Sequence, residues 1–196
     1  MIRISRPECP YPVALANNNY KHPLNKQALL NSTYGKCMYC ESKILAVDYG
    51  DVEHILPKAE GRFPHLEFDW GNLGIACGKC NNSKSDQYNA ELPYVNPYEE
   101  NPSDYLVAEY NLIFSLRGCE RGALTINDIE LNRVELIERR KTHVDRIRDA
   151  VTAVFSRQDA NLRRLALAEL AKEANPDKEY SFVVETLLRQ HRIIEA

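Results

Sequence analysis

Residues 51–57 of the chain have the sequence DVEHILP, and this stretch determines the fold that we predict. It places Glu53 and His54 in a short strand that stops at a proline, because proline cannot donate a hydrogen bond to a strand ladder. A second apolar run, LGIA at 73–76, predicts a partner strand. The polar stretch 81–88 contains residues that favour the start of a helix. We therefore expect two short strands and a helix around His54.

Two cysteine pairs flank this stretch. They are Cys37 with Cys40 and Cys77 with Cys80. The C-x2-C spacing lets two thiolates hold one face of a tetrahedral zinc ion, and two such pairs complete a closed structural site. We therefore expect one structural Zn²⁺ per chain. The alternative is four unrelated buried cysteines, which rarely arise with this twin spacing. Cys9 and Cys119 stand alone and are expected to be small buried residues or free thiols.

The residues between the cysteine pairs resemble the motif of HNH (ββα-metal) endonucleases. An acid and a histidine are followed by Asn72, and Asn81 comes directly after the last cysteine. The resemblance implies that His54 takes a proton from water and that Asn72 braces the loop that aims it. It also implies that Glu53 and Asn81 hold a catalytic Mg²⁺ or Mn²⁺, hard ions that prefer oxygen ligands. The last motif letter is often histidine, and asparagine at 81 strengthens the magnesium interpretation. Lys84 is expected to bind a phosphate of the substrate.

Each of these residues also has a plainer interpretation. A lone histidine is usually a polar residue near the surface, and we adopt that interpretation for His22, His65, His143 and His191. For His54, the conjunction of acid-His-apolar-apolar-Pro with Asn-Leu and Cys-x-x-Cys-Asn-x-x-Lys favours a functional role. Trp70 is expected to pack in the core, not to stack on a base.

Further motifs extend the resemblance along the chain, to the HNH effector proteins of Septu-type and retron-type bacterial anti-phage defence systems. They are ISRP at 4–7, CMYCE at 37–41, PK at 57–58, DWGNL at 69–73, NP at 96–97, TI at 125–126, LNR at 131–133 and RR at 139–140. The resemblance implies an effector nuclease that a partner ATPase of the ABC or SMC-like type controls. DNA is the first expected substrate, and RNA, including tRNA, is the second.

Composition limits the remaining possibilities. The 196 residues are 44% hydrophobic and 27% charged, as in globular proteins, and their formal net charge of −3 creates no global field that would attract nucleic acid. We find no apolar run of the ~18 residues that a membrane span needs. The basic first residues lack an apolar segment, so we expect no signal peptide and a cytoplasmic location. A reducing cytoplasm favours cysteines as metal ligands over disulfides.

The predicted fold class is α+β, with a small zinc-stapled ββα module and a helical C-terminal region. The expected divisions are an N-terminal arm and short helix (1–30), the HNH module (31–90), a linker with short strands (91–124) and the helical region (125–196). The arm is expected to be irregular to about residue 20, before a helix at 23–30. In the helical region, Asn132 is the expected N-cap of the main helix, a second helix covers 161–174, and a third follows Pro176.

The helical region also predicts association. Its apolar stripes exceed what a short helix pair can bury, and its many arginines suit either a protein partner or a nucleic-acid backbone. We expect contact with the ATPase or with a second copy as a homodimer. Two other classes of function remain open. One is a zinc-ribbon module that binds nucleic acid or protein without cutting, and the other is a structural subunit whose helices scaffold a complex.

Overall fold

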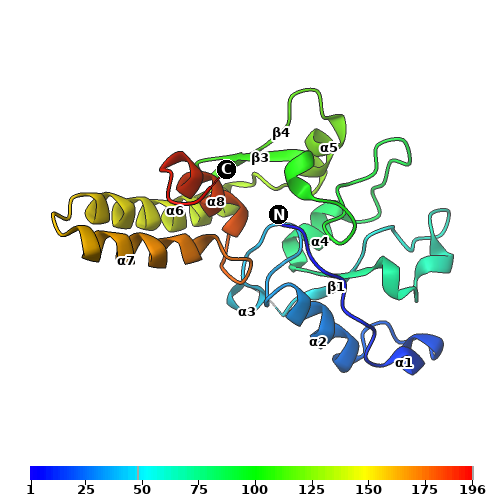
Figure 1. Ribbon diagram of the computed structural model, residues 1–196. Helices are drawn as coiled ribbons and strands as arrows, with labels where there is room; N and C mark the ends of the chain where they lie inside the picture. Colours follow the sequence, from blue (N-terminus) through cyan, green and yellow to red (C-terminus); the bar gives the residue numbers. More distant parts are fainter. Residues whose placement is uncertain (48, 196) are drawn as a thin grey trace.

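The structure, a computed structural model that describes residues 1–47 and 49–195, confirms the α+β fold class: two small antiparallel sheets combine with α-helices (Figure 1). The strands are β1 (Asp51–His54), β2 (Leu73–Ala76), β3 (Leu106–Glu109) and β4 (Leu112–Ser115). The helices are α1 (Pro12–Ala16), α2 (Pro23–Ser32), α3 (Ile44–Val47), α4 (Gly78–Lys84), α5 (Glu120–Asp128), α6 (Val134–Phe155), α7 (Ala160–Ala171) and α8 (Ser181–Gln190).

The two strands predicted around His54 are confirmed, and α4 follows them directly. β1 pairs antiparallel with β2, with His54 opposite Leu73. The helix, predicted to open at Asn81, begins three residues earlier at Gly78, so it contains Cys80. The earlier start agrees with the packing. Because both residues are now helical, Cys80 and Lys84, four positions apart, lie on one helix face, and both side chains are buried.

The N-terminal arm was predicted to have an irregular backbone to about residue 20, but it contains one short helix. Helix α1 begins at Pro12, a position that proline tolerates because the first N–H groups of a helix have no partner within it. Residues 1–9 form no helix or strand and lie against the segment that leads into β2. Arg6 donates to the carbonyls of Trp70 and Leu73, and the Trp70 indole donates to the Pro7 carbonyl at 2.8 Å. As expected, Trp70 packs against the core.

The segment expected to be a linker with short strands contains the hairpin of β3 and β4, so the short strands are confirmed. Helix α5 begins at Glu120, within the expected linker, and crosses its expected end at 124 into the region predicted to be helical. Asn132 was expected to cap α6, and that prediction was wrong because its amide pairs with both backbone groups of Ile113, at 2.7 and 3.0 Å. Arg133 occupies the N-cap position without a side-chain cap.

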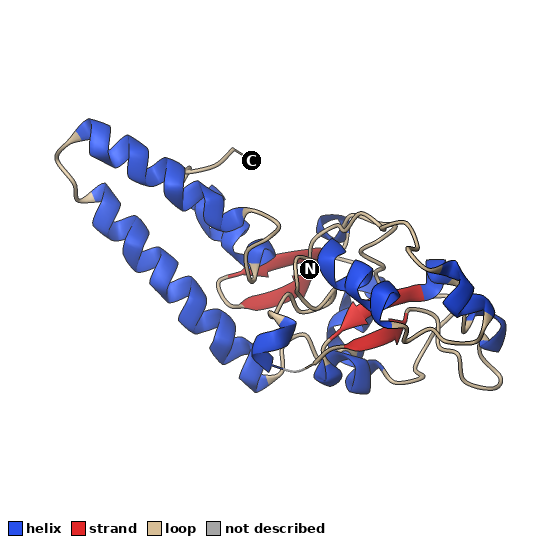
Figure 2. Ribbon diagram, turned by 90° about the horizontal axis from the view of Figure 1, so that it is seen from below, coloured by secondary structure: helices blue, strands red, loops and turns tan. Residues whose placement is uncertain are grey.

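The C-terminal region is helical, as predicted. Helices α6 and α7 form an antiparallel hairpin that projects from the body (Figure 2). None of the residues of α7, all of which the structure describes, is buried. Large apolar side chains near the end of this hairpin are exposed: Phe155 at 47%, Leu162 at 57% and Leu165 at 55%.

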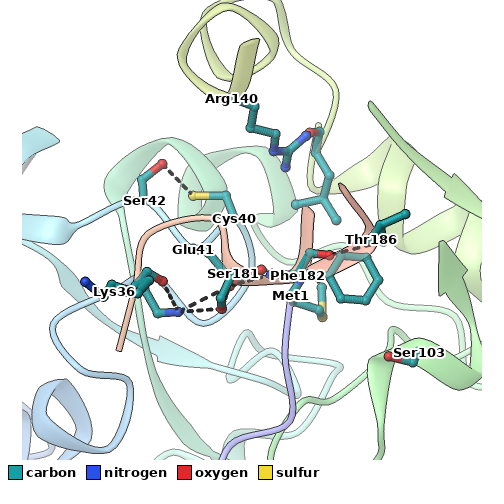
Figure 3. A network of polar contacts seen from close by, with 12 residues as sticks. Met1, Lys36, Cys40, Glu41, Ser42, Ser103, Arg140, Ser181, Phe182 and Thr186 are labelled. Carbon is teal, nitrogen blue, oxygen red and sulfur yellow. Dashed lines mark hydrogen bonds and ion pairs between the residues drawn. The ribbon is translucent and has the colours of Figure 1, made fainter. Parts of the chain in front are cut away.

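A buried polar network ties α8 to the loop that carries the first cysteine pair (Figure 3). The carboxylate of Glu41 accepts from Ser181 at 2.7 Å and from Lys36 at 3.2 Å, and it pairs with the Met1 amine at 3.2 Å. Burial alone would raise the pKa of Glu41, but the two neighbouring cations hold it at about 2. The network therefore fixes the C-terminal helix next to Cys40.

Candidate metal centre and active site

Four cysteine side chains form a buried group at one end of the ββα unit, which we call the cysteine cluster (Cys37, Cys40, Cys77 and Cys80). All four Sγ atoms lie within 4.8 Å of one another, and those of Cys40 and Cys77 are 3.8 Å apart. A tetrahedral zinc ion with Zn–S bonds of ~2.3 Å needs S–S separations of roughly 3.8 Å. The donors therefore fit such an ion in number, type and spacing.

Backbone contacts hold the first cysteine pair against β2. The N–H of Met38 donates to the carbonyl of Ile75 at 3.0 Å, which aligns the Cys37 turn with the strand leading to Cys77. Gly74 in β2 makes this approach possible, because a Cβ at that position would lie 2.4 Å from the Met38 sulfur. The fold thus brings together cysteines that are 37 positions apart in the sequence.

An arginine from the helical region reaches the cysteine cluster. The guanidinium of Arg133 donates to the sulfur of Cys80 at 3.5 Å and lies 4.0 Å from that of Cys77. Burial opposes the charge of Arg133, but the nearby cysteines raise its pKa above the ordinary value. A group of four thiolates on a divalent ion carries a net negative charge, which this cation partly balances.

His54 lies in an open cavity of about 450 Å³ that is also lined by residues of α4, and we call it the His54 cavity. It is lined by Tyr20, Lys21, residues 51–54, residues 57–59, Asn81, Asn82, Ser85 and Asp86. Of the predicted site residues, Glu53, His54 and Asn81 line this cavity together. Lys84 is buried against Glu53, and Asn72 is buried and lines a different cavity.

The His54 ring is held by a backbone carbonyl. Its Nε2 lies 3.0 Å from the carbonyl oxygen of Glu67. A carbonyl only accepts, so Nε2 carries the proton and Nδ1 is the basic nitrogen. Burial lowers the pKa of His54 below the ordinary histidine value, so the ring is neutral near pH 7. This tautomer and charge state suit a general base.

Asn72 braces the loop that contains this carbonyl. Its side chain accepts from the Leu56 N–H at 2.7 Å and donates to the Leu56 and Leu66 carbonyls at 2.9 and 3.2 Å. The amide therefore closes the 56–66 loop as a backbone bridge would. Leu66 directly precedes Glu67, whose carbonyl contacts His54, and Asn72 itself does not line the His54 cavity.

Glu53 and Lys84 form a buried ion pair. Lys84 Nζ lies 2.8 Å from Glu53 Oε1 and donates to the His54 carbonyl at 2.8 Å, and Tyr39 donates to the same Oε1 at 3.1 Å. Burial raises the pKa of Glu53, although Lys84 opposes the shift. Lys84 was expected to meet a phosphate, but it is only 1% exposed. One turn after Cys80, it faces the core and leaves Oε2 of Glu53 as the oxygen able to face a metal ion.

Asn81 is oriented by an acid that the sequence analysis did not single out. Its Nδ2 donates to Asp51 Oδ2 at 3.1 Å, which turns the carbonyl oxygen Oδ1 of Asn81 away from that contact. Asp51 and Glu53 are two residues apart on β1 and project to the same face of the strand. Carboxylate and amide oxygens at this edge fit a hard divalent ion such as Mg²⁺, which keeps several waters.

Two further residues that the sequence analysis missed complete the cavity. The ring of Tyr20 meets the His54 ring edge to face at 4.7 Å between centroids. Lys58 donates to the Tyr20 hydroxyl at 2.9 Å and pairs with Glu67 at 2.6 Å. Burial opposes the charge of Lys58, but the contacts with Glu67 and Tyr20 raise its pKa. Tyr20 comes from the arm, 34 positions before His54, and no local pattern marks it.

Comparisons with known proteins match this geometry. Residues 37–87, from the first cysteine to just beyond α4, match the model of the HNH endonuclease family. The chain is also similar to the Septu protein PtuB of Bacillus thuringiensis, with 31% identity over 149 residues, covering 69% of this chain and 56% of the relative.

A second relative shows the same level of similarity. It is the Septu protein PtuB of Bacillus mycoides (strain KBAB4), 31% identical over 150 residues, covering 62% of this chain and 51% of the relative. The chain therefore spans about half the length of the curated relatives it matches.

Proposed function

Because residues 37–87 form a domain of the HNH endonuclease family, we propose that the protein hydrolyses phosphodiester bonds in nucleic acid with a divalent metal ion in the His54 cavity. The observation that carries this proposal is the orientation of His54. Its Nε2–H is fixed on the Glu67 carbonyl, and it lies beside oxygen donors in an open cavity. A non-catalytic zinc ribbon has no need of a histidine held in this way.

In the proposed reaction, Nδ1 of His54 takes a proton from a water molecule whose oxygen attacks the phosphorus. A P–O bond to water forms as the bond to the leaving sugar oxygen breaks. Glu53 and Asn81 would hold Mg²⁺ or Mn²⁺, which would stabilise charge on the phosphate. Lys84 and Tyr39 position Glu53, and Asp51 positions Asn81.

The cysteine cluster is proposed to hold one structural Zn²⁺. The tetrahedral spacing of its sulfur atoms and the Arg133 guanidinium beside them support this assignment. All four positions are filled by the protein, so this ion has no open site for substrate. Its role would be to hold the Cys37 turn, the end of β2 and α4 in register, within the proposed module 31–90.

The similarity to Septu PtuB proteins supports a role as the effector nuclease of an anti-phage defence complex. We propose that a partner ATPase of the ABC or SMC-like type controls it, and that the exposed apolar side chains of the α6–α7 hairpin take part in association. DNA is the proposed substrate, with RNA as the alternative. Among the described residues, no helix has both the length and the apolar character needed to cross a membrane.

A cleavage assay tests the proposal. The purified protein, with and without a candidate partner ATPase of the ABC or SMC-like type, is incubated in Mg²⁺ with labelled DNA and RNA pools. We expect cleavage that a chelator stops and that His54→Ala lowers by roughly 10²–10⁴-fold, with zinc content unchanged. If His54→Ala cuts as well as the parent protein, the nuclease assignment fails and a zinc-ribbon binding module becomes the better account.

A further inference from the structure

We propose that three cations outside the His54 cavity, Lys79, Arg139 and Arg146, form a basic track that binds the phosphate backbone of the substrate beyond the point of cleavage. This inference rests on the proposed nuclease function and deepens it. The track would guide a nucleic acid from the cavity across α4 and along α6. It explains how a chain with a net charge of −3 holds a polyanion.

The track is continuous with the His54 cavity. Asn82 lines that cavity, and Lys79 precedes it by three residues on α4, so their side chains are neighbours on one helix face. Lys79 and Arg139 both line a second cavity of about 150 Å³ beside the cysteine cluster. Arg139 also lines a third cavity of about 340 Å³, together with Arg146. The His54 cavity and the second cavity therefore adjoin through one turn of α4, and the second and third cavities share Arg139.

The three cations are free to bind an anion. All three side chains are exposed, and within residues 1–47 and 49–195 the structure shows no ion pair or side-chain hydrogen bond for any of them. Two other α6 cations, Lys141 and Arg148, both pair with Asp145, at 3.0 and 2.7 Å. The cations on that face of α6 are therefore engaged within the protein, and those of the basic track are not.

Other arginines at the start of α6 do not belong to the track. Arg133 donates to Cys80, and Arg140 is buried, donating to the Leu131 carbonyl at 2.7 Å. The sequence does not distinguish these inward cations from the outward ones. The structure divides them by the face of the helix on which they lie.

The spacing and surroundings suit a phosphodiester backbone. Arg139 and Arg146 are seven residues apart, about 10 Å along the helix axis, which equals roughly three backbone phosphates at ~3.4 Å of axial rise. His143 lies between them, and its buried Nε2 has no hydrogen-bond partner among the described residues. Two acids, Glu135 and Glu179, also line these cavities, and Glu179 accepts from the Lys43 N–H at 3.0 Å.

An acidic protein surface could also attract these cations. The continuity with the His54 cavity favours nucleic acid, because a strand held at the scissile phosphate must leave the cavity across an adjoining surface. Lys79, a single helical turn from a cavity-lining residue, lies where such a strand would pass.

The test measures binding as a function of salt. In a His54→Ala background, a labelled 30-nucleotide duplex and a single strand of the same length are titrated at several salt concentrations. Each phosphate contact contributes about 0.9 to the slope of log K against log salt for duplex DNA and about 0.7 for a single strand. We expect the triple variant Lys79→Gln, Arg139→Gln, Arg146→Gln to lose about 2 to 3 units of that slope.

The matched control is Lys141→Gln with Arg148→Gln, which removes the two cations that pair with Asp145 and should leave the slope unchanged. An equal loss of slope in the control and the triple variant would overturn the track, and so would an unchanged slope in the triple variant. If the slope falls as expected but the wild-type protein, with its ATPase, never cleaves, the track stands and the nuclease proposal fails. If the wild-type protein cleaves but the triple variant keeps its slope, the nuclease proposal stands and the track fails.

Discussion

The cysteine cluster and the His54 cavity both include residues of α4, yet they are built in different ways. The cluster takes all its side chains from two local C-x2-C turns, and every sulfur atom is buried. The cavity draws on segments from Tyr20 to Asp86, and several of its polar groups already bond to one another. A motif with fixed spacing specifies the first site, whereas tertiary contacts specify the second.

This difference implies that substitutions in the two sites should have unequal consequences, an asymmetry between the cysteine cluster and the His54 cavity. Helix α4 carries Cys80 into the cluster and Asn81 into the cavity, so loss of the cluster should also displace Asn81. Loss of the Asn81 or His54 side chain should leave the cluster intact, because their hydrogen bonds go to Asp51 and Glu67 and not to the cysteine turns. Four substitutions test this asymmetry, from the largest expected effect to the smallest.

Cys77→Ser is expected to unfold the HNH module. Structural zinc contributes apparent binding energies on the order of 10 kcal/mol in small zinc folds, and serine is a poor replacement for a thiolate ligand. Zinc content, measured by elemental analysis, should fall from one per chain to near zero, and the thermal transition should broaden or disappear. Cleavage is lost as a consequence.

The matched control is Cys119→Ser, at a cysteine that caps α5 by accepting from the Gly122 N–H. It should keep its zinc and most of its stability. Pure wild-type protein that contains no zinc would contradict the assignment of the cysteine cluster.

Asn81→Ala is expected to lower cleavage by roughly 10²-fold while zinc content and melting temperature stay close to those of the wild type. The loss should be partly reversed at high Mg²⁺ or with Mn²⁺, because the variant lacks a metal ligand and keeps its general base. Asn81 is a cleaner test than Glu53→Ala. Removing Glu53 would leave Lys84 buried without its partner, at a cost of about 3–5 kcal/mol.

His54→Ala, assayed beside it, should show no such recovery with metal. If neither variant recovers at high Mg²⁺, Asn81 is not a ligand. If both lose zinc, the asymmetry between the two sites is wrong.

The sequence predicted the two strands, the fold class and the cysteine pairs because each leaves a local pattern: β1 ends before a proline, and the cysteines keep a fixed spacing. It could not predict the partners of polar side chains. Asparagine is a residue type that favours N-cap positions, yet the amide of Asn132 bonds to the backbone of Ile113 instead. Lysine is a residue type that often binds phosphate, yet the position of Lys84 on α4 directs its side chain inward, to Glu53.

The same limit explains the residues that were missed. Tyr20 and Lys58 contact each other and enclose His54 only after the arm has folded against the module. The first half of helix α5 escaped prediction because it lies at the end of a segment whose earlier prolines indicated a linker. Local patterns thus define elements and metal ligands, while the surroundings of a catalytic base depend on the complete fold.

Asn72→Ala is expected to lower cleavage by roughly 10–100-fold, the usual range for residues that orient a catalytic or metal-binding side chain. The substitution removes three hydrogen bonds from the 56–66 loop and so loosens the Glu67 carbonyl that fixes His54. Because Asn72 touches neither metal nor substrate, added Mn²⁺ should not restore the rate. A recovery with Mn²⁺ would instead place Asn72 among the metal ligands.

Tyr20→Phe should have the smallest effect, because it keeps the ring against His54 and removes only the hydroxyl that accepts from Lys58. One hydrogen bond contributes about 1 kcal/mol, which corresponds to roughly a 5-fold change in rate. Tyr20→Ala, which also removes the ring, should lower the rate further and raise the pKa of His54, because burial is what depresses it. The rate is measured against pH for both variants and the parent protein. If Tyr20→Ala matches Tyr20→Phe in rate and pH profile, the arm contributes only its hydroxyl to the His54 cavity, and the ring contact has no catalytic consequence.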